Sequence, residues 1–311
     1  MTIVTTMCKL LFAMAIGFIL YKMKILTSDA NKKMSSLIVN VTCPCLIICS
    51  VSDVSHDDPQ MVLKLFAAGV IIYLLLPLFS WVVVRLMRVP EELRGTYMCM
   101  FMFSNNQFMG FPVVQALYGE SAIFYATIFN MPFNIILFSL GLNLLHKDAS
   151  VTTGEYKKEK FNPKKLINMG IISAVAAMVI YFANLKLPDL FYECLSFVGN
   201  ITTPLSMIII GSSLAAASLK DIKNEKGVWP MLPVRLAVIP LLTWCFMHLF
   251  TTDPTIIGVA TVTLGMPIAS MVAMSAVQYE RQSKCASIGV AMSTICSMVT
   301  IPIMSILLGV G

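Results

Sequence analysis

The residues best suited to bind a solute lie inside two apolar stretches of the chain. The first stretch contains the polar run Ser104-Asn105-Asn106-Gln107, whose amides can both donate and accept hydrogen bonds. Glycine and proline follow this run, and the second stretch repeats them with a hydroxyl nearby: Gly110, Pro112, Gly265, Pro267 and Ser270. The pattern indicates polar groups held against a locally interrupted backbone.

The two Gly-x-Pro patterns predict broken helices. Proline removes a backbone donor and clashes with the carbonyl four residues earlier, and glycine loosens the turn further. We expect new helix N-termini at Pro112 and at Pro267, each with free N–H groups and a partial positive charge. If the breaks face each other, Asn105, Asn106 and Gln107 can donate hydrogen bonds to an anion, with Ser270 opposite.

Three further polar residues are secondary candidates. Asn40 and Asn200 could contact a ligand or bind neighbouring helices together, a role worth about 0.6 kcal/mol for such a side chain. Arg235 lies about one helical turn inside its apolar stretch. It could contact an anion in transit, but snorkelling to lipid headgroups is the safer expectation.

The composition indicates a membrane protein. Of the 311 residues, 58% are hydrophobic and 12% charged, whereas soluble domains carry about 25% charged residues. This excludes an ordinary soluble enzyme, a disordered protein and a nucleic-acid binder. The net charge of +6 changes nothing, because the lysines lie between apolar runs and form no basic face.

The apolar runs predict an all-α polytopic membrane protein with ten transmembrane helices. A spanning helix needs about 20 apolar residues. The expected ranges are 3–21, 34–51, 61–84, 95–116, 122–145, 166–184, 192–217, 231–250, 255–277 and 286–309.

Loop charge predicts the orientation. The loops after helices 1, 3, 5, 7 and 9 hold 18 of the 22 basic residues. The positive-inside rule places these loops in the cytoplasm, so we expect a multi-pass protein of the cell membrane with both termini outside.

The chain is predicted to contain an inverted repeat. Asn40-Val41-Thr42-Cys43-Pro44 matches Asn200-Ile201-Thr202-Thr203-Pro204, and Gly110-Phe111-Pro112 matches Gly265-Met266-Pro267. We expect five-helix repeats at 1–146 and 166–311, joined by a cytoplasmic linker at 147–165. Because each half has an odd number of spans, the halves must enter the membrane from opposite sides. Many secondary transporters share this architecture, with broken helices 4 and 9 crossing at the substrate site.

No catalytic or cofactor chemistry is predicted. All sixteen acidic residues fall in loops or at helix ends, and HExxH, nucleophile-elbow and P-loop motifs are missing. The nine cysteines lack metal-ligand spacing. We therefore expect no enzyme, no metal and no cofactor.

The chain resembles the auxin efflux carrier family of bacterial permeases and, more remotely, the plant PIN-type exporters. The resemblance rests on Asn40 to Pro44, Asn105 to Pro112, Thr203-Pro204-Leu205, Met266-Pro267 and Ile301-Pro302. It implies helices crossing as an X, organic-anion substrates such as auxin, malate or malonate, and a role for Asn105 near the substrate carboxylate. Ser104 and Gln107 stand where the family often has glycines, and Met271 replaces a common polar residue.

The expected function is a secondary transporter that moves a small organic acid by alternating access across the bilayer. Export is favoured, because one charge crossing 100 mV is worth about 2.3 kcal/mol and an anion leaves a negative interior without a coupling ion. The alternative is a proton- or cation-coupled importer of malate or malonate. A membrane sensor or assembly factor and an intramembrane enzyme are further alternatives. No nucleic-acid partner is expected, and a homodimer is left open.

Overall fold

The computed structural model describes residues 3–52, 59–153, 168–216, 225–276, 280–307 and 309. Every regular element in these ranges is a helix, and the extended backbone forms one isolated bridge and no strand. Five helices in the described ranges are long and apolar enough to cross a membrane, and shorter apolar helices accompany them. The prediction of an all-helical membrane protein is confirmed at this level.

Helical segments occupy each of the ten predicted ranges. The first half contains α1 (Ile3–Lys22), α2 (Ser28–Leu37), α3 (Cys43–Cys49), α4 (Pro59–Leu86), α5 (Arg94–Met102), α6 (Phe111–Tyr118), α7 (Ser121–Ile136) and α8 (Leu142–Thr153). The second contains α9 (Met169–Phe182), α10 (Asp189–Gly199), α11 (Thr202–Ala216), α13 (Met231–Pro233), α14 (Ile239–Met247), α15 (Pro254–Gly265), α16 (Ser270–Ser275) and α17 (Glu280–Leu307). Helix α8 continues seven residues into the range predicted as the linker, and residues 154–165 of that linker lie outside the described part.

Wide π-turns join several of these helices: η1 (Ile38–Thr42), η3 (Asn106–Gly110), η4 (Leu137–Gly141) and η7 (Val234–Val238). Three of them end two residues before a proline, at Pro44, Pro112 and Pro240. In a π-turn the hydrogen bonds reach back five residues, so the carbonyl that would clash with the proline ring is released. The chain therefore passes these prolines without a break.

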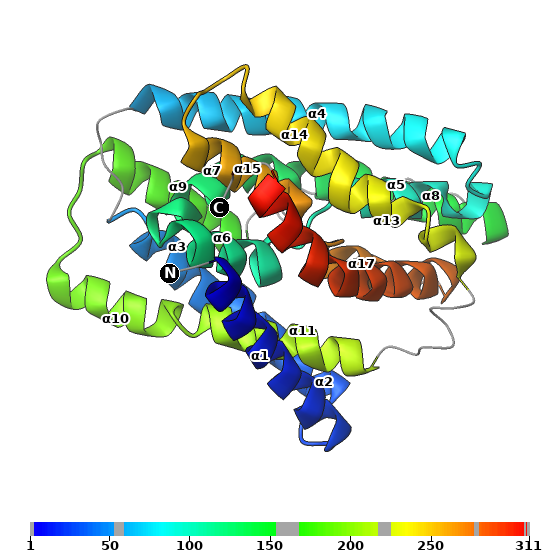
Figure 1. Ribbon diagram of the computed structural model, residues 1–311, viewed down its shortest axis with the longest axis horizontal. Coiled ribbons are helices and arrows are strands. Elements are labelled where there is room, and N and C mark those ends of the chain that lie inside the picture. Colours follow the sequence, from blue (N-terminus) through cyan, green and yellow to red (C-terminus); the bar gives the residue numbers. More distant parts are fainter. Residues whose placement is uncertain are drawn as a thin grey trace.

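The helices form two packed groups that enclose the interrupted segments. Figure 1 shows α4 and α14 running along one face of the molecule, with α10 and α11 on the opposite face and α1 crossing α11. Helices α5, α6, α7 and α15 lie between these faces, and α17 packs on α5, α15 and α16.

Glycines bring helix backbones into direct contact inside each group. A Cβ at Gly17 would lie 2.0 Å from the carbonyl oxygen of Ile208, and one at Gly211 would lie 1.9 Å from that of Met14. Small residues permit such close approach between membrane helices. Helices α1 and α11 are thus fastened by two reciprocal contacts, and Gly69 fastens α4 to α7 in the same way.

We expect Gly211→Ala to lower the thermal stability of the purified protein by about 1–3 kcal/mol, because the new methyl group forces α1 and α11 apart. Thermal unfolding in detergent measures the change. Ser213→Ala is the matched control, because Ser213 is exposed on the same helix. Equal melting temperatures for the two variants would contradict the close packing.

Candidate functional site

The centre of the molecule is the point where the two interrupted helices meet. Ser104 pairs with Ile268 as an antiparallel β-bridge. The N–H of Asn105 donates to the Pro267 carbonyl at 2.8 Å, and the N–H of Ala269 donates to the Phe103 carbonyl at 2.9 Å. Inside a membrane, backbone N–H and carbonyl groups that lack helical hydrogen bonds need other hydrogen-bond partners. Here the backbone of each interrupted segment provides such partners for the other segment.

The interruptions start at other residues than the sequence pattern predicts. The first interrupted helix consists of α5 before the interruption and of η3 and α6 after it. Its second half begins at Asn106, the first residue of η3, so Pro112 already lies inside the helix. The prediction of a helix start at Pro112 is wrong, because η3 accommodates the proline and the helix is interrupted earlier, at the non-helical residues 103–105.

The second interruption is also displaced from its predicted start. Pro267 lies in the extended segment, and α16 begins at Ser270. The prediction of a helix start at Pro267 is therefore wrong. Met266 has ψ 155°, since a residue before proline avoids the helical region. Gly265 ends α15 and Gly110 ends η3, so both glycines border a structural change.

A cavity of about 250 Å³ opens at the crossing. The first crossing helix contributes Ser104, Asn105, Asn106, Gln107 and Phe108, and the second contributes Ala269, Met271 and Met274. Helix α2 and its π-turn close another side with Lys32, Ser35, Ser36, Val39 and Asn40, and α7 adds Asn130, Phe133 and Asn134. No acidic side chain is among these described lining residues. Asn106, the first residue of η3, and Ala269 and Met271, which flank the first residue of α16, thus border one cavity.

Two buried amides in the wall of this cavity differ in their hydrogen bonding. Asn106 donates to Asn130 Oδ1 at 2.6 Å, and the Tyr73 hydroxyl donates to the same oxygen at 2.7 Å. This network fixes Asn106 to α4 and α7. The side-chain nitrogen of Asn105, a residue only 3% exposed, has no hydrogen-bond partner among the described atoms. A buried unpaired donor is costly, so Asn105 is available to a ligand.

Of the sequence candidates Asn40, Asn200 and Ser270, the structure places only Asn40 in the lining of the cavity. Asn40 is exposed on the α2 side of the cavity, where its amide donates to Ser36. Asn200 is exposed away from the cavity and donates to Ser196. Ser270 starts α16 but does not line the cavity, whereas its neighbours Ala269 and Met271 do. Asn130 and Asn134 of α7 also line the cavity, whereas the sequence suggested only packing or bonds between helices for these two residues.

Arg235 is fully buried, with 0% exposure. The expectation that it snorkels to lipid headgroups is wrong. Its guanidinium donates to the Leu264 carbonyl at 2.8 Å and to Ser104 Oγ at 2.6 Å. The reason is that η7 turns this side chain inward, onto the ends of the two crossing helices.

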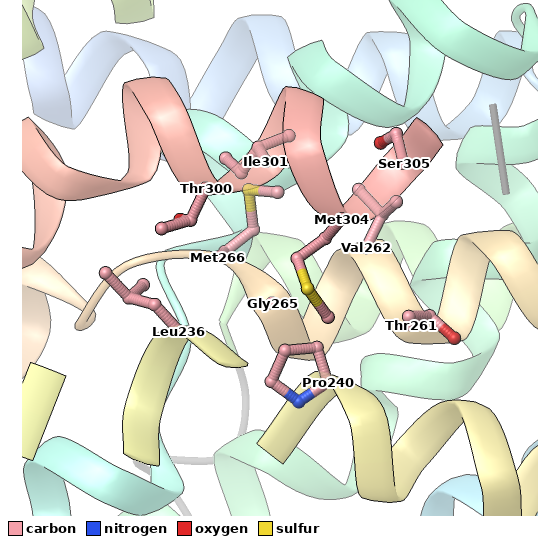
Figure 2. A pocket seen from close by; sticks show the side chains of 10 residues that line it. All are labelled: Leu236, Pro240, Thr261, Val262, Gly265, Met266, Thr300, Ile301, Met304 and Ser305. Carbon is pink, nitrogen blue, oxygen red and sulfur yellow. The ribbon is translucent and has the colours of Figure 1, made fainter. Parts of the chain in front are cut away.

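A second hollow lies between α14, α15 and α17, close to the crossing (Figure 2). Its volume is about 10 Å³, and side chains such as Leu236, Met266 and Met304 line it. One water molecule needs about that much room. This hollow cannot hold an organic solute. Another cavity, of about 230 Å³ between α4 and α14, is lined by apolar side chains apart from Thr243, so the 250 Å³ cavity with its amides is the candidate site.

Comparison with known proteins identifies the family of this chain. Residues 2–305 match the sequence profile of the family described as membrane transport protein. The chain belongs to this family. It is 22% identical over 312 residues to an uncharacterised transporter of Methanothermobacter thermautotrophicus, covering 97% of each chain. It is 23% identical over 312 residues to an uncharacterised transporter of Methanocaldococcus jannaschii, covering 94% of each.

The membrane transport protein family is the one that the sequence motifs predicted, so the resemblance to the auxin efflux carriers is confirmed. The protein is a multi-pass membrane transporter.

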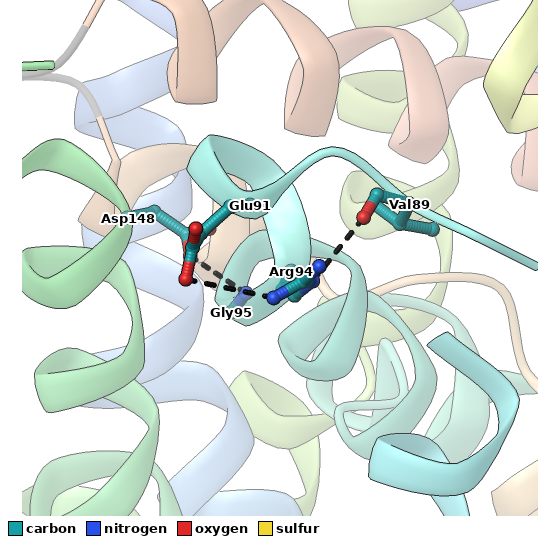
Figure 3. A network of polar contacts seen from close by, with 5 residues as sticks. All are labelled: Val89, Glu91, Arg94, Gly95 and Asp148. Atoms are coloured by element: carbon teal, nitrogen blue, oxygen red, sulfur yellow. Dashed lines mark hydrogen bonds and ion pairs between the residues drawn. The ribbon is translucent and has the colours of Figure 1, made fainter. Parts of the chain in front are cut away.

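A buried carboxylate positions the first half-helix of this transporter. Asp148 of α8 is 3% exposed and accepts hydrogen bonds from the N–H groups of Gly95 and Thr96, at 2.8 and 2.6 Å, and from the Thr96 hydroxyl. Figure 3 shows it beside Arg94, which pairs with Glu91 at 3.5 Å. An acidic group at a helix N-terminus satisfies free donors and compensates the dipole. Asp148 thereby fixes the start of α5.

We expect Asp148→Asn to destabilise the protein by about 1–3 kcal/mol, because an amide cannot accept all three hydrogen bonds. Thermal unfolding of the purified variant measures the effect. Asp29→Asn is the control, since Asp29 forms an exposed pair with Lys33. If both variants melt together, Asp148 does not hold α5.

Proposed function

We propose that this protein is a secondary transporter, not an enzyme, that carries a small organic anion across the cell membrane by alternating access. The observation that carries the proposal is the cavity at the helix crossing, lined by amides, hydroxyls and helix starts and by no described acidic residue. Such a lining can hold a carboxylate through hydrogen bonds without a bound metal.

Several donors favour an anion in this cavity. At the start of η3 the N–H of Asn106 donates to the Ser104 carbonyl at 2.9 Å, which leaves those of Gln107 and Phe108 as donors, and this helix continues through α6 to Tyr118. The unpaired amide nitrogen of Asn105 adds a side-chain donor. Lys32, which is exposed, adds a cation to the α2 side. An anion accepts from these donors more strongly than a neutral solute does, and Lys32 repels a cationic one.

The size of the cavity suits a small acid. Drug-sized ligands occupy pockets of about 300–1,000 Å³, and this cavity has about 250 Å³. A mono- or dicarboxylate of a few carbon atoms fits with some water, at about 30 Å³ for each water molecule.

Contacts between the halves support the inverted-repeat architecture. Thr202 donates to Thr42 at 2.8 Å, and these residues match each other at the repeat offset of 160. Residues related by a twofold axis can meet only on that axis. Likewise, α1 of the first half packs on α11 of the second, while α3 of the first packs on α9 of the second.

The packing also supports alternating access. Backbone contacts at glycine fasten α1 to α11 and α4 to α7, within the two helix groups. Between α11 and α6 the contact includes side chains: the Thr203 hydroxyl donates to Gln115 Oε1 at 2.7 Å. A transporter of this kind moves one rigid group against the other around a central site.

The cavity indicates a cytoplasm-facing state. It borders Lys32 and Ser36 in α2, near the basic end of that helix. The loop charges assign this end to the cytoplasm, with both termini outside. An anion entering from the cytoplasm would leave along the membrane potential, so export requires no coupling ion.

Purified protein should bind malonate or malate, and Asn105→Ala should weaken binding about 10- to 100-fold, because a hydrogen bond to a charged group is worth about 1.5–3 kcal/mol. Isothermal calorimetry or ligand-dependent thermal shift measures the affinity. Asn200→Ala is the matched control, an exposed asparagine away from the cavity. Equal affinities for the two variants would remove Asn105 from the site.

Radiolabelled malonate should leave proteoliposomes loaded with it, provided that the protein is present, and a potassium diffusion potential negative inside should accelerate its exit. A potential-insensitive flux that instead follows a pH or sodium gradient into the vesicles would favour the coupled importer. Asn105→Ala protein should show flux close to that of empty vesicles.

A further inference from the structure

Arg235 is the largest fully buried side chain in the described part of the protein. Arginine remains protonated in proteins, so its charge must be balanced or solvated. Neither ion pair found in the described ranges includes it, since both lie at exposed positions around Asp29 and Arg94. Its Nε atom also has no hydrogen-bond partner there. The positive charge is therefore only partly compensated.

The two acceptors of Arg235 share one property. Leu264 lies in the last turn of α15, and Ser104 lies two residues beyond the end of α5. The two helices that precede the interruptions, α5 and α15, thus both end beside the guanidinium group of Arg235. A cation there compensates the partial negative charge of both helix C-termini and binds one carbonyl at the end of α15, that of Leu264. This explains how the charge is tolerated, but helix ends supply only a fraction of a unit charge.

Ser104 connects this cation to the substrate site. Its hydroxyl accepts the 2.6 Å hydrogen bond from Arg235, and the same residue lines the 250 Å³ cavity. Arg235 therefore lies one hydrogen bond behind the cavity wall and does not line the cavity itself.

We propose that Arg235 is the positioning residue that sets the charge selectivity of this transporter. It holds Ser104 and Leu264 together, and its incompletely balanced charge makes the cavity attract an anion that completes the balance. The inference rests on the proposed function, because it assigns the charge preference of the same site.

The test compares two ligands that differ by one charge, malonate and its half-amide malonamate, at a pH where all carboxylates are ionised. Arg235→Gln removes the charge and retains donors, whereas Arg235→Lys retains the charge. We expect Arg235→Gln to weaken malonate binding about tenfold or more and malonamate binding clearly less. Arg235→Lys should keep most of the wild-type affinity ratio. Equal losses for both ligands in Arg235→Gln would overturn the proposal, since a structural defect is blind to ligand charge.

A second pair of variants keeps the proposal testable if Arg235→Gln does not fold. Ser104→Asp places a permanent counter-charge against Arg235, and Ser104→Asn is its neutral match. We expect the Asp variant to melt at a higher temperature than the Asn variant and to lose stabilisation by malonate. A lower melting temperature for Ser104→Asp would show that Arg235 needs no counter-charge.

The two proposals fail in different ways. If wild-type protein binds neither malonate nor malonamate, the proposed substrate class is wrong. The melting comparison of Ser104→Asp with Ser104→Asn still decides whether the charge of Arg235 is uncompensated.

Discussion

The short antiparallel pairing between the two interrupted helices is the constraint on which the rest of the structure depends. Ser104 and Ile268 face each other, and two backbone hydrogen bonds join Phe103 and Asn105 to the second chain segment. An interrupted helix inside a bilayer leaves donors and acceptors that lipid cannot satisfy. Each interruption is therefore stable only because the other lies beside it. The Ser293 hydroxyl, which accepts a hydrogen bond from the N–H of Ile268, adds support from α17.

Because of this pairing, the C-terminal ends of α5 and α15 lie beside Arg235, whereas the N-terminal ends of η3 and α16 lie near the cavity. The first half-helices end at Arg235, which binds the Leu264 carbonyl and the Ser104 hydroxyl. The parts that follow the interruptions begin at Asn106, which lines the cavity, and at Ser270, whose neighbours line it. A fixed cation thus lies at the negative ends, and in the proposed function a solute lies near the positive ends. The start of α5 carries its own counter-charge in Asp148, which is buried against Gly95 and Thr96.

Pro267 differs in its consequence from Pro44, Pro112 and Pro240, and the turn before each proline accounts for the difference. Pro44, Pro112 and Pro240 each follow a π-turn, and the chain continues as helix. Pro267 has no such turn before it, so Met266 becomes extended and α15 ends. Pro77, Pro132 and Pro302 lie inside α4, α7 and α17 without a π-turn before them, so a wide turn accompanies some of the prolines and not all. Close glycine contacts, as at Gly17 and Gly211, then hold the surrounding helices as firm groups.

The sequence by itself determined the membrane class, the helical segments and the polar run that lines the cavity, because apolar length and buried amides are local properties of the chain. It also determined the family, through motifs spread over nearly the whole length. Tertiary structure alone decided where the helices break, because a π-turn at Pro112 cannot be distinguished from a break by residue type. It likewise decided that Arg235 points inward, that Asn130 joins Asn106, and that Asp148 is buried. Each of these depends on a partner far away in sequence, and no local pattern specifies such a partner.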